Sequence, residues 1–171
     1  TEYVGLHFKQ YDDFIYSPVI KQEVMQVIPT DKGHVTVYLS HYSDEVVLKV
    51  LHNVRDIRFE VFSKKVKQPV VSANVTLLPI SNEGFTQSLI HSHGVITGAG
   101  FETPAEALYL GKKLLVLPIK GQYEQLCNAA ALKDFNVVVV DQLSADFHTK
   151  VINWLATANT QKLSLSQDTF Q

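Results

Sequence analysis

Short apolar segments alternate with segments of helical spacing from His34 onward. Two of the apolar segments, 114–117 and 137–140, are uninterrupted runs. Such runs are typical of strands that are buried on both faces of a parallel sheet. The pattern predicts strands over residues 34–39, 57–62, 75–78, 94–97, 113–119 and 136–141. It predicts helices over residues 44–54, 84–91, 104–110, 124–133 and 145–156.

This alternation predicts the fold class. Right-handed crossovers between parallel strands give an α/β, Rossmann-like, doubly wound parallel sheet of about six strands. Residues 34–157 are the predicted domain. Residues 1–33 mix aromatic and polar residues, with a short helix expected over 19–25, and pack on this domain or on a part outside the chain. Residues 158–171 form a polar tail that is expected to be loose or to dock elsewhere.

Composition and charge narrow the function classes. The 171 residues suit one domain, and a net charge of −2 without a long basic run argues against nucleic-acid binding. The densest basic spot, Lys64, Lys65 and Lys67, is interpreted as a solvated strand end. A single cysteine, Cys127, fits a reducing compartment and is expected to be buried on a helix. The chain has neither a signal peptide nor an apolar run of about 18 residues, which predicts a cytoplasmic location. Its first residue, Thr1, suggests a piece of a longer protein.

The most informative segment follows the strand predicted at 94–97. Residues 98–103 form a glycine turn that leads into a helix. Backbone N–H groups and a helix N-terminus at one spot suit a phosphate. Glu106 lies one turn further, where its carboxylate would accept hydrogen bonds from the hydroxyls of a sugar. A second polar cluster, 121–129, follows the next strand, so the two turns are expected to share one cleft.

Each feature also has a structural explanation. Residues 103–106 read as a capping box, with Thr103 at N-cap and Glu106 at N3. Gly98 and Gly100 are also explained as turn residues, although two glycines in three positions at a strand end favour close approach to the backbone. Glu124 and Asn128 share a helix face, with Gln125 beside them, which also describes a solvated first turn.

Two further chemistries are disfavoured. Residues 98–103 are close to a dinucleotide fingerprint, but no acidic residue follows the next strand to hold a ribose. His91 and His93 have no carboxylate or cysteine spaced to complete a metal site.

From about Pro18 to Leu155 the chain resembles the C-terminal, donor-binding half of a GT-B glycosyltransferase. This group includes the lipid II-forming MurG enzyme and the UDP-glycosyltransferases. The UDP-glycosyltransferase signature reads Thr-His-x-Gly-x-Asn-Ser-x-x-Glu, then a strand, then Asp-Gln-x-x-Asn-Ala. Residues 97–106 and 124–129 fall on its two parts. The chain is also similar to bacterial and archaeal hypothetical glycosyltransferases with Ile-Thr-Gly-Ala-Gly-Phe and a later Glu-Gln-x-x-Asn-Ala.

The resemblance implies a role for each matching residue. Glu106 would hold the ribose hydroxyls of a nucleotide-diphosphate sugar, with no metal or other cofactor. The diphosphate would be held by Gly98, Ala99, Gly100, Phe101 and Thr103, the donor sugar by Glu124, Gln125 and Asn128, and the base by Pro79, Ile80 and Phe85.

Three positions depart from the signature or its relatives. Gly98 stands where the signature has its phosphate-contacting His, and Glu102 stands on its Asn. The loop at 40–43 lacks the glycines of many relatives. Glu102 is expected to face solvent, because its carboxylate would otherwise repel the diphosphate.

The resemblance implies a transferase whose acceptor domain is not in the chain. Residues 1–33 would be an interdomain linker and the remnant of that N-terminal domain. The whole protein would transfer a hexosyl or N-acetylhexosaminyl group from a UDP-sugar, whereas this fragment would bind the donor without transfer. Peripheral membrane association through the missing half stays open. The alternatives are half of a UDP-N-acetylglucosamine 2-epimerase and a non-catalytic nucleotide-binding or interaction module.

Overall fold

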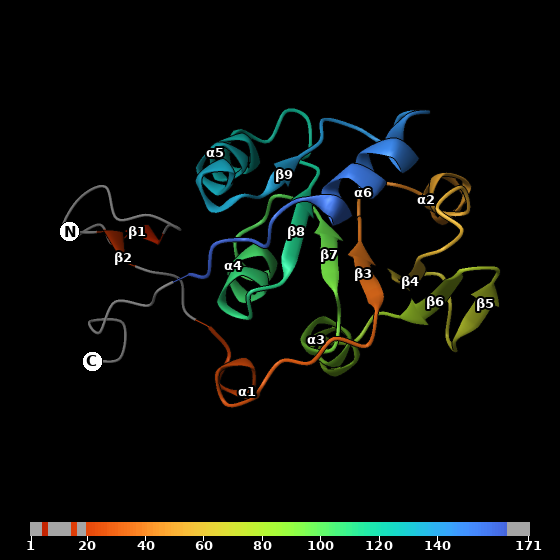
Figure 1. The fold of residues 1–171 in the computed structure, drawn as a ribbon, viewed down its shortest axis with the longest axis horizontal. Helices are drawn as coiled ribbons and strands as arrows, with labels where there is room; N and C mark the ends of the chain where they lie inside the picture. The colour runs from red at the N-terminus through yellow and green to blue at the C-terminus, as the bar shows by residue number, and fades with distance from the viewer. Residues whose placement is uncertain (1–4, 7–14, 17–19, 164–171) are drawn as a thin grey trace.

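The computed structural model describes residues 5–6, 15–16 and 20–163 (Figure 1). The described strands form one seven-stranded sheet and one parallel pair. The pair is β1 (Gly5–Leu6) and β2 (Ile15–Tyr16). The large sheet contains β3 (His34–Tyr38), β4 (Arg58–Ser63), β5 (Val70–Ser72), β6 (Val75–Pro79), β7 (Gly94–Thr97), β8 (Lys113–Val116) and β9 (Val138–Val139). The helices are α1 (Gln22–Met25), α2 (Asp44–Leu51), α3 (Asn82–Ile90), α4 (Glu102–Tyr109), α5 (Tyr123–Leu132), the 3₁₀ helix η1 (Lys133–Phe135) and α6 (Phe147–Ala156).

The strand order of the large sheet is β5-β6-β4-β3-β7-β8-β9, which can be followed across Figure 1. All neighbouring pairs are parallel except β5 with β6. Without β5, this is the order of a Rossmann sheet, and it confirms the predicted doubly wound α/β fold. The order reverses between β3 and β7. Connections therefore leave these two strands in opposite directions, and the crevice at their carboxyl ends is where such sheets bind ligands.

Helices cover both faces of the sheet. Because neighbouring residues of a strand point to opposite faces, each central strand contributes side chains to two cores. Val95 belongs to the core under α3, α4 and α5, whereas Ile96 belongs to the core under α2 and α6. The second core contains the largest fully buried side chains, Trp154, Phe59 and Phe147. The continuous apolar strands predicted from the sequence are thus explained by burial on two sides.

Strand β5 is the element of the large sheet that the sequence pattern missed. It pairs antiparallel with β6, with Val70 opposite Leu77, and lies at the edge of the sheet. Val70 and Val71 are exposed, and the strand follows Pro69 directly. Edge strands are short and need no buried face, so they leave a weak hydrophobic pattern.

Residues of both terminal segments, from Ile20 and up to Leu163, pack on the domain. Ile20 and Val24 are buried in the core beside α3 and α4. At the other end, Thr160 donates a hydrogen bond to the carbonyl of Lys112 (2.6 Å), and Leu163 is buried. The expectation that the tail is loose or docks elsewhere is therefore wrong for residues 160–163, because a single apolar anchor and backbone pairing hold them. Residues 1–4, 7–14, 17–19 and 164–171 lie outside the described structure.

None of the described helices combines the length and the apolar character that a bilayer crossing requires.

Candidate functional site

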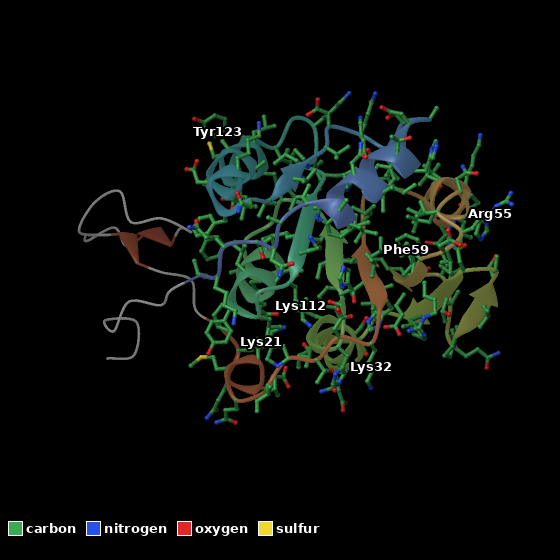
Figure 2. All side chains as sticks on the ribbon, in the orientation of Figure 1. Lys21, Lys32, Arg55, Phe59, Lys112 and Tyr123 are labelled. Carbon is green, nitrogen blue, oxygen red and sulfur yellow. The ribbon has the colours of Figure 1, made fainter. Side chains whose placement is uncertain are left out.

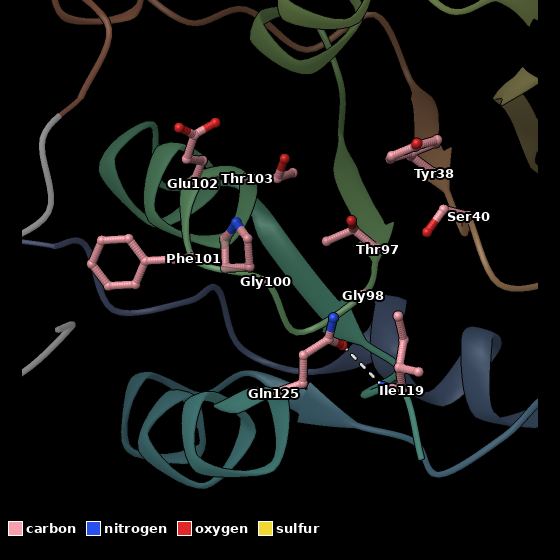
Figure 3. A pocket seen from close by; sticks show the side chains of 11 residues that line it. Tyr38, Ser40, Thr97, Gly98, Gly100, Phe101, Glu102, Thr103, Ile119 and Gln125 are labelled. Atoms are coloured by element: carbon pink, nitrogen blue, oxygen red, sulfur yellow. Dashed lines mark hydrogen bonds between the residues drawn. The ribbon is translucent and has the colours of Figure 1, made fainter. Parts of the chain in front are cut away.

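The loop after β7 forms one wall of a cavity of about 280 Å³ at the carboxyl ends of β3, β7 and β8. This is the point where the strand order reverses, and Figure 3 shows the side chains around it. Of the residues predicted to hold a phosphate, Gly98, Gly100, Phe101 and Thr103 line the cavity. Ala99, the loop residue between the two glycines, is fully buried. The cavity is lined by Tyr38, Ser40, Thr97, Gly98, Gly100, Phe101, Glu102, Thr103, Pro104, Ile119 and Gln125.

The two glycines of this loop are not needed for its backbone conformation. Among the described glycines, a positive φ occurs at Gly33, Gly111 and Gly121 but not at Gly98 or Gly100. A Cβ at Gly100 would meet no atom within 4 Å, and a Cβ at Gly98 would meet Gln125 Oε1 at 3.6 Å. Neither backbone strain nor tight packing therefore explains their lack of a side chain. What remains is access to the backbone from the cavity, which suits a ligand that approaches closely.

Helix α4 begins at this loop without a side-chain cap. Ser43 caps α2, accepting a hydrogen bond from the N–H of Val46, and Ser81 caps α3, accepting one from the N–H of Gly84. The N-cap residue of α4 is Phe101, which makes no side-chain cap, as is also true of the N-cap residues of α1, α5 and α6. First-turn N–H groups have no intrahelical acceptor, and the first helical residues, Glu102 and Thr103, line the cavity, so the positive end of the helix dipole lies at its wall.

The predicted capping box is therefore wrong. Helix α4 starts at Glu102, which places Pro104 at the third helical position and Glu106 in the second turn. Proline fits anywhere in the first turn, because the N–H that it lacks has no intrahelical partner there. The Thr-Pro pair thus predicted the helix correctly but placed its first residue two positions too late.

Two side chains of α5 hold the loop in place from below. Gln125 Oε1 accepts hydrogen bonds from the N–H of Ala99 (3.3 Å) and of Ile119 (2.9 Å), the latter drawn in Figure 3. Asn128 Nδ2 donates to the carbonyl of Ala99 (3.0 Å). Both backbone groups of Ala99 are thereby paired with one helix, since Gln125 and Asn128 are neighbours at i, i+3. Gln125 still lines the cavity, whereas Asn128 is buried beneath the loop.

The remaining polar residue predicted on this helix has a different position. Glu124 is exposed and does not line the described cavity, so it does not face the loop together with Asn128. The expected burial of Cys127 is also wrong, because its side chain is exposed on the outer face of α5. That face also carries Tyr123, which is 80% exposed (Figure 2).

A second cavity, of about 190 Å³, continues the first along the carboxyl edge of the sheet. The two share Tyr38, Glu102 and Thr103 as lining residues. Of the residues predicted to hold the base, Ile80 and Phe85 line it, while Pro79 ends β6 and does not. The Phe85 ring packs edge-on against Phe62 (5.2 Å between centroids) and Tyr38 (6.2 Å), giving this cavity an aromatic wall.

Glu106 lines neither cavity; it is buried and paired with Lys21, a residue of the N-terminal segment that lines the second cavity. Only 3% of Glu106 is exposed, and its Oε1 lies 3.6 Å from Lys21 Nζ. Burial raises the pKa of the Glu106 carboxyl above its ordinary value, and the Lys21 charge opposes that rise. Glu102 is exposed but lines both cavities, so the expectation that it turns away from the diphosphate site is not confirmed.

The histidines near β7 each have a hydrogen-bond partner in the segment before β3. His93 Nδ1 lies 2.7 Å from Asp31 Oδ2, and His91 Nδ1 lies 2.5 Å from the hydroxyl of Thr30. Within residues 20–163, no group of three or more His, Cys, Asp and Glu side chains is arranged to hold a metal ion.

Sequence reasoning missed Tyr38, Ser40 and Lys21 as lining residues. Tyr38 ends β3 and Ser40 follows it, and the rule that ligands bind beyond the carboxyl ends at the strand-order reversal could have indicated them. Lys21 comes from the segment before the domain, and no local pattern connects it to residues 80–103.

Comparisons with known proteins agree with this geometry. A family model described as "Glycosyl transferase family 1" matches residues 2–156, whereas no curated protein matches the chain. The glycotransferase of kitacinnamycin has a similar structure, with a TM-score of 0.62 and 16% identity over 88% of this chain and 45% of that one. CalG4, the calicheamicin glycosyltransferase, has a TM-score of 0.61 and 16% identity over 88% of this chain and 42% of that one. The spinosyn forosaminyltransferase SpnP has a TM-score of 0.52 and 13% identity over 83% of this chain and 40% of that one.

At these identities the similar structures establish the fold. They are GT-B glycosyltransferases, and the chain spans less than half the length of each. The Rossmann-like sheet, the cavity at its strand-order reversal and the family match over residues 2–156 lead to one conclusion. The chain belongs to glycosyl transferase family 1.

Proposed function

We propose that the chain binds a nucleotide-diphosphate sugar, a UDP-sugar, along the carboxyl edge of its sheet. The observation that carries the proposal is the loop at Gly98 and Gly100. Neither backbone conformation nor tight packing requires a glycine at these positions, and the helix that follows has no side-chain cap. The diphosphate would lie on this loop, where first-turn N–H groups and the helix dipole favour negative charge. The base would occupy the adjoining aromatic cavity at Ile80 and Phe85.

The ribose would bind between these two positions. Glu106 lines neither cavity but pairs with Lys21 of the aromatic cavity, and its carboxylate would accept hydrogen bonds from the ribose hydroxyls. Gln125 Nε2 has two hydrogens, of which one is donated to Gln122 Oε1, so the other would serve the donor sugar. Glu124, exposed at the start of α5, would reach the sugar from outside. Asn128 would act through its hold on the Ala99 carbonyl.

In the longer protein, we propose transfer of a hexosyl or N-acetylhexosaminyl group to an acceptor bound by an N-terminal domain. Family membership and the GT-B structures, each more than twice as long as the matched part, support this proposal. The leaving diphosphate would be stabilised by the preorganised N–H groups of α4, and we propose neither a metal nor a cofactor. The chain alone would bind the donor without transferring it.

Thermal unfolding with millimolar UDP tests the binding proposal. A ligand at about 100 times its dissociation constant stabilises the folded state by about 2.7 kcal/mol. The midpoint of the chain should therefore rise by roughly 5–10 °C. If UDP, GDP and TDP all leave the midpoint unchanged, the donor-site proposal fails for this chain.

A further inference from the structure

Lys21 stands at the mouth of the aromatic cavity although it belongs to the N-terminal segment. It directly precedes α1 and lies between α1 and α4 (Figure 2). Its neighbours Ile20 and Val24 are buried in the core, so the backbone beside it is fixed. The Lys21 side chain lines the cavity together with Ile80 and Phe85.

The two connected cavities hold few charges. Among the residues described as lining them, Lys21 is the one cation and Glu102 is the one carboxylate. A nucleotide diphosphate placed there would add further negative charge next to Glu102. Gly98, at the end of β7, offers no side chain to compensate it. The ammonium of Lys21 is therefore the compensating charge within these two cavities, whereas Lys64 and Lys65 line a third cavity that shares Tyr38 and Ser40 with the first.

The contact between Lys21 and Glu106 is loose. Their charged atoms are 3.6 Å apart, whereas a charge-assisted hydrogen bond measures about 2.7–2.9 Å. The two side chains also differ in accessibility, since 40% of the Lys21 side chain is exposed and only 4% of that of Glu106. Glu106 cannot follow the ammonium outward, but the long, flexible Lys21 side chain can move toward solvent or a ligand.

We infer that Lys21 is a diphosphate-binding residue that exchanges partners when the donor binds. In the free chain its ammonium pairs with Glu106. On binding, the ribose hydroxyls take over the Glu106 carboxylate, and the ammonium turns to the phosphates. This inference rests on the proposed function, and it makes the segment before the domain part of the donor site.

Paired titrations with UDP and with uridine test the exchange. Lys21→Gln should weaken UDP binding by at least about tenfold, because a hydrogen bond to a charged group is lost. Its affinity for uridine should change less than about twofold, since uridine carries no phosphate. Lys21→Arg should retain most of the UDP affinity. Lys150→Gln removes a lysine of α6 whose side chain is also 40% exposed and lies 3.5 Å from Asp146, and it serves as the matched control with unchanged affinity.

The outcomes separate the two claims. If the wild-type chain binds neither UDP nor uridine, the proposed function fails, and the inference fails with it. If the wild-type chain binds both, and Lys21→Gln leaves UDP affinity unchanged or weakens uridine equally, the exchange alone is wrong. Retained uridine binding also shows that the variant is folded.

Discussion

Replacement of Glu106 by glutamine should reduce the UDP-dependent rise in the unfolding midpoint to about half or less, without destabilising the free chain. Glutamine keeps the volume of the side chain but offers one carbonyl oxygen in place of a charged acceptor pair. Hydrogen bonds to a charged group contribute about 1.5–3 kcal/mol, so a ribose that loses them should bind roughly 10- to 100-fold more weakly. Isothermal titration with UDP measures this loss directly.

The pH dependence of stability gives the same variant a second readout. Burial raises the pKa of Glu106 in the folded chain, so the folded state binds this proton more tightly than the unfolded state. The contribution of Glu106 to stability must then increase as the pH falls through its folded pKa toward its unfolded pKa. Glu106→Gln lacks this component and should be at least as stable as the wild type at neutral pH. Lys21, whose side chain is 40% exposed, keeps its hydration when its partner is gone.

Glu124→Gln is the matched control for Glu106→Gln. Glu124 is exposed and is proposed to contact the transferred donor sugar, which is absent from UDP. Its replacement should leave both UDP affinity and the midpoint unchanged. Full UDP affinity in Glu106→Gln would refute the assignment of Glu106 to the ribose.

Substitution of Gly100 should separate binding from folding. The Cβ of Gly100→Ala would point into open space, and no left-handed φ has to be preserved. The midpoint of the free chain is therefore expected to change by less than about 2 °C, as for a surface substitution. UDP affinity should fall by about tenfold, because the methyl group occupies the space through which the phosphates approach the backbone. Gly100→Asp should bind UDP more weakly still, since it adds a negative charge.

Gly111→Ala provides the contrasting case. Gly111 has a φ of +69°, and an added Cβ would lie 2.7 Å from the Lys162 side chain. This substitution should lower stability and leave the UDP affinity of the folded chain intact. If Gly100→Ala and Gly100→Asp bind UDP as the wild type does, the diphosphate does not lie on this loop.

The sequence predicted the alternation of strands and helices and the polar loops that follow the strands. Uninterrupted apolar runs indicated parallel strands buried on two sides, and the structure confirms them. The loop containing Gly98 and Gly100 was expected to share a cleft with the start of α5, and Gln125 indeed lines the same cavity.

Features that depend on distant partners were not predictable. Gln125 and Asn128 hold the backbone of Ala99, an interaction across 26 and 29 residues that no local pattern reveals. The spacing of Glu124 and Asn128 suggested a common face, but the exposure of Glu124 depends on where α5 meets the sheet. The packing of Leu163 likewise depends on a groove made by residues elsewhere in the chain.

A control region for binding lies away from the proposed site. A cavity of about 300 Å³ is lined by His34 at the start of β3, by Arg58 at the start of β4, and by residues of α3. Its polar groups are paired internally, with His34 Nε2 lying 2.9 Å from the Ser88 carbonyl and the Ser88 hydroxyl donating to Glu60 (2.5 Å). A ligand at the carboxyl edge should leave this region unchanged.

Amide chemical shifts during a titration with UDP report where the nucleotide binds, residue by residue, and a chain of 19.2 kDa suits the measurement. We expect the largest changes at the backbone N–H groups of Gly98, Gly100 and Glu102, with none at His34 or Ser88. Changes centred on His34 and Ser88, or no changes at millimolar UDP, would contradict a donor site on the loop after β7.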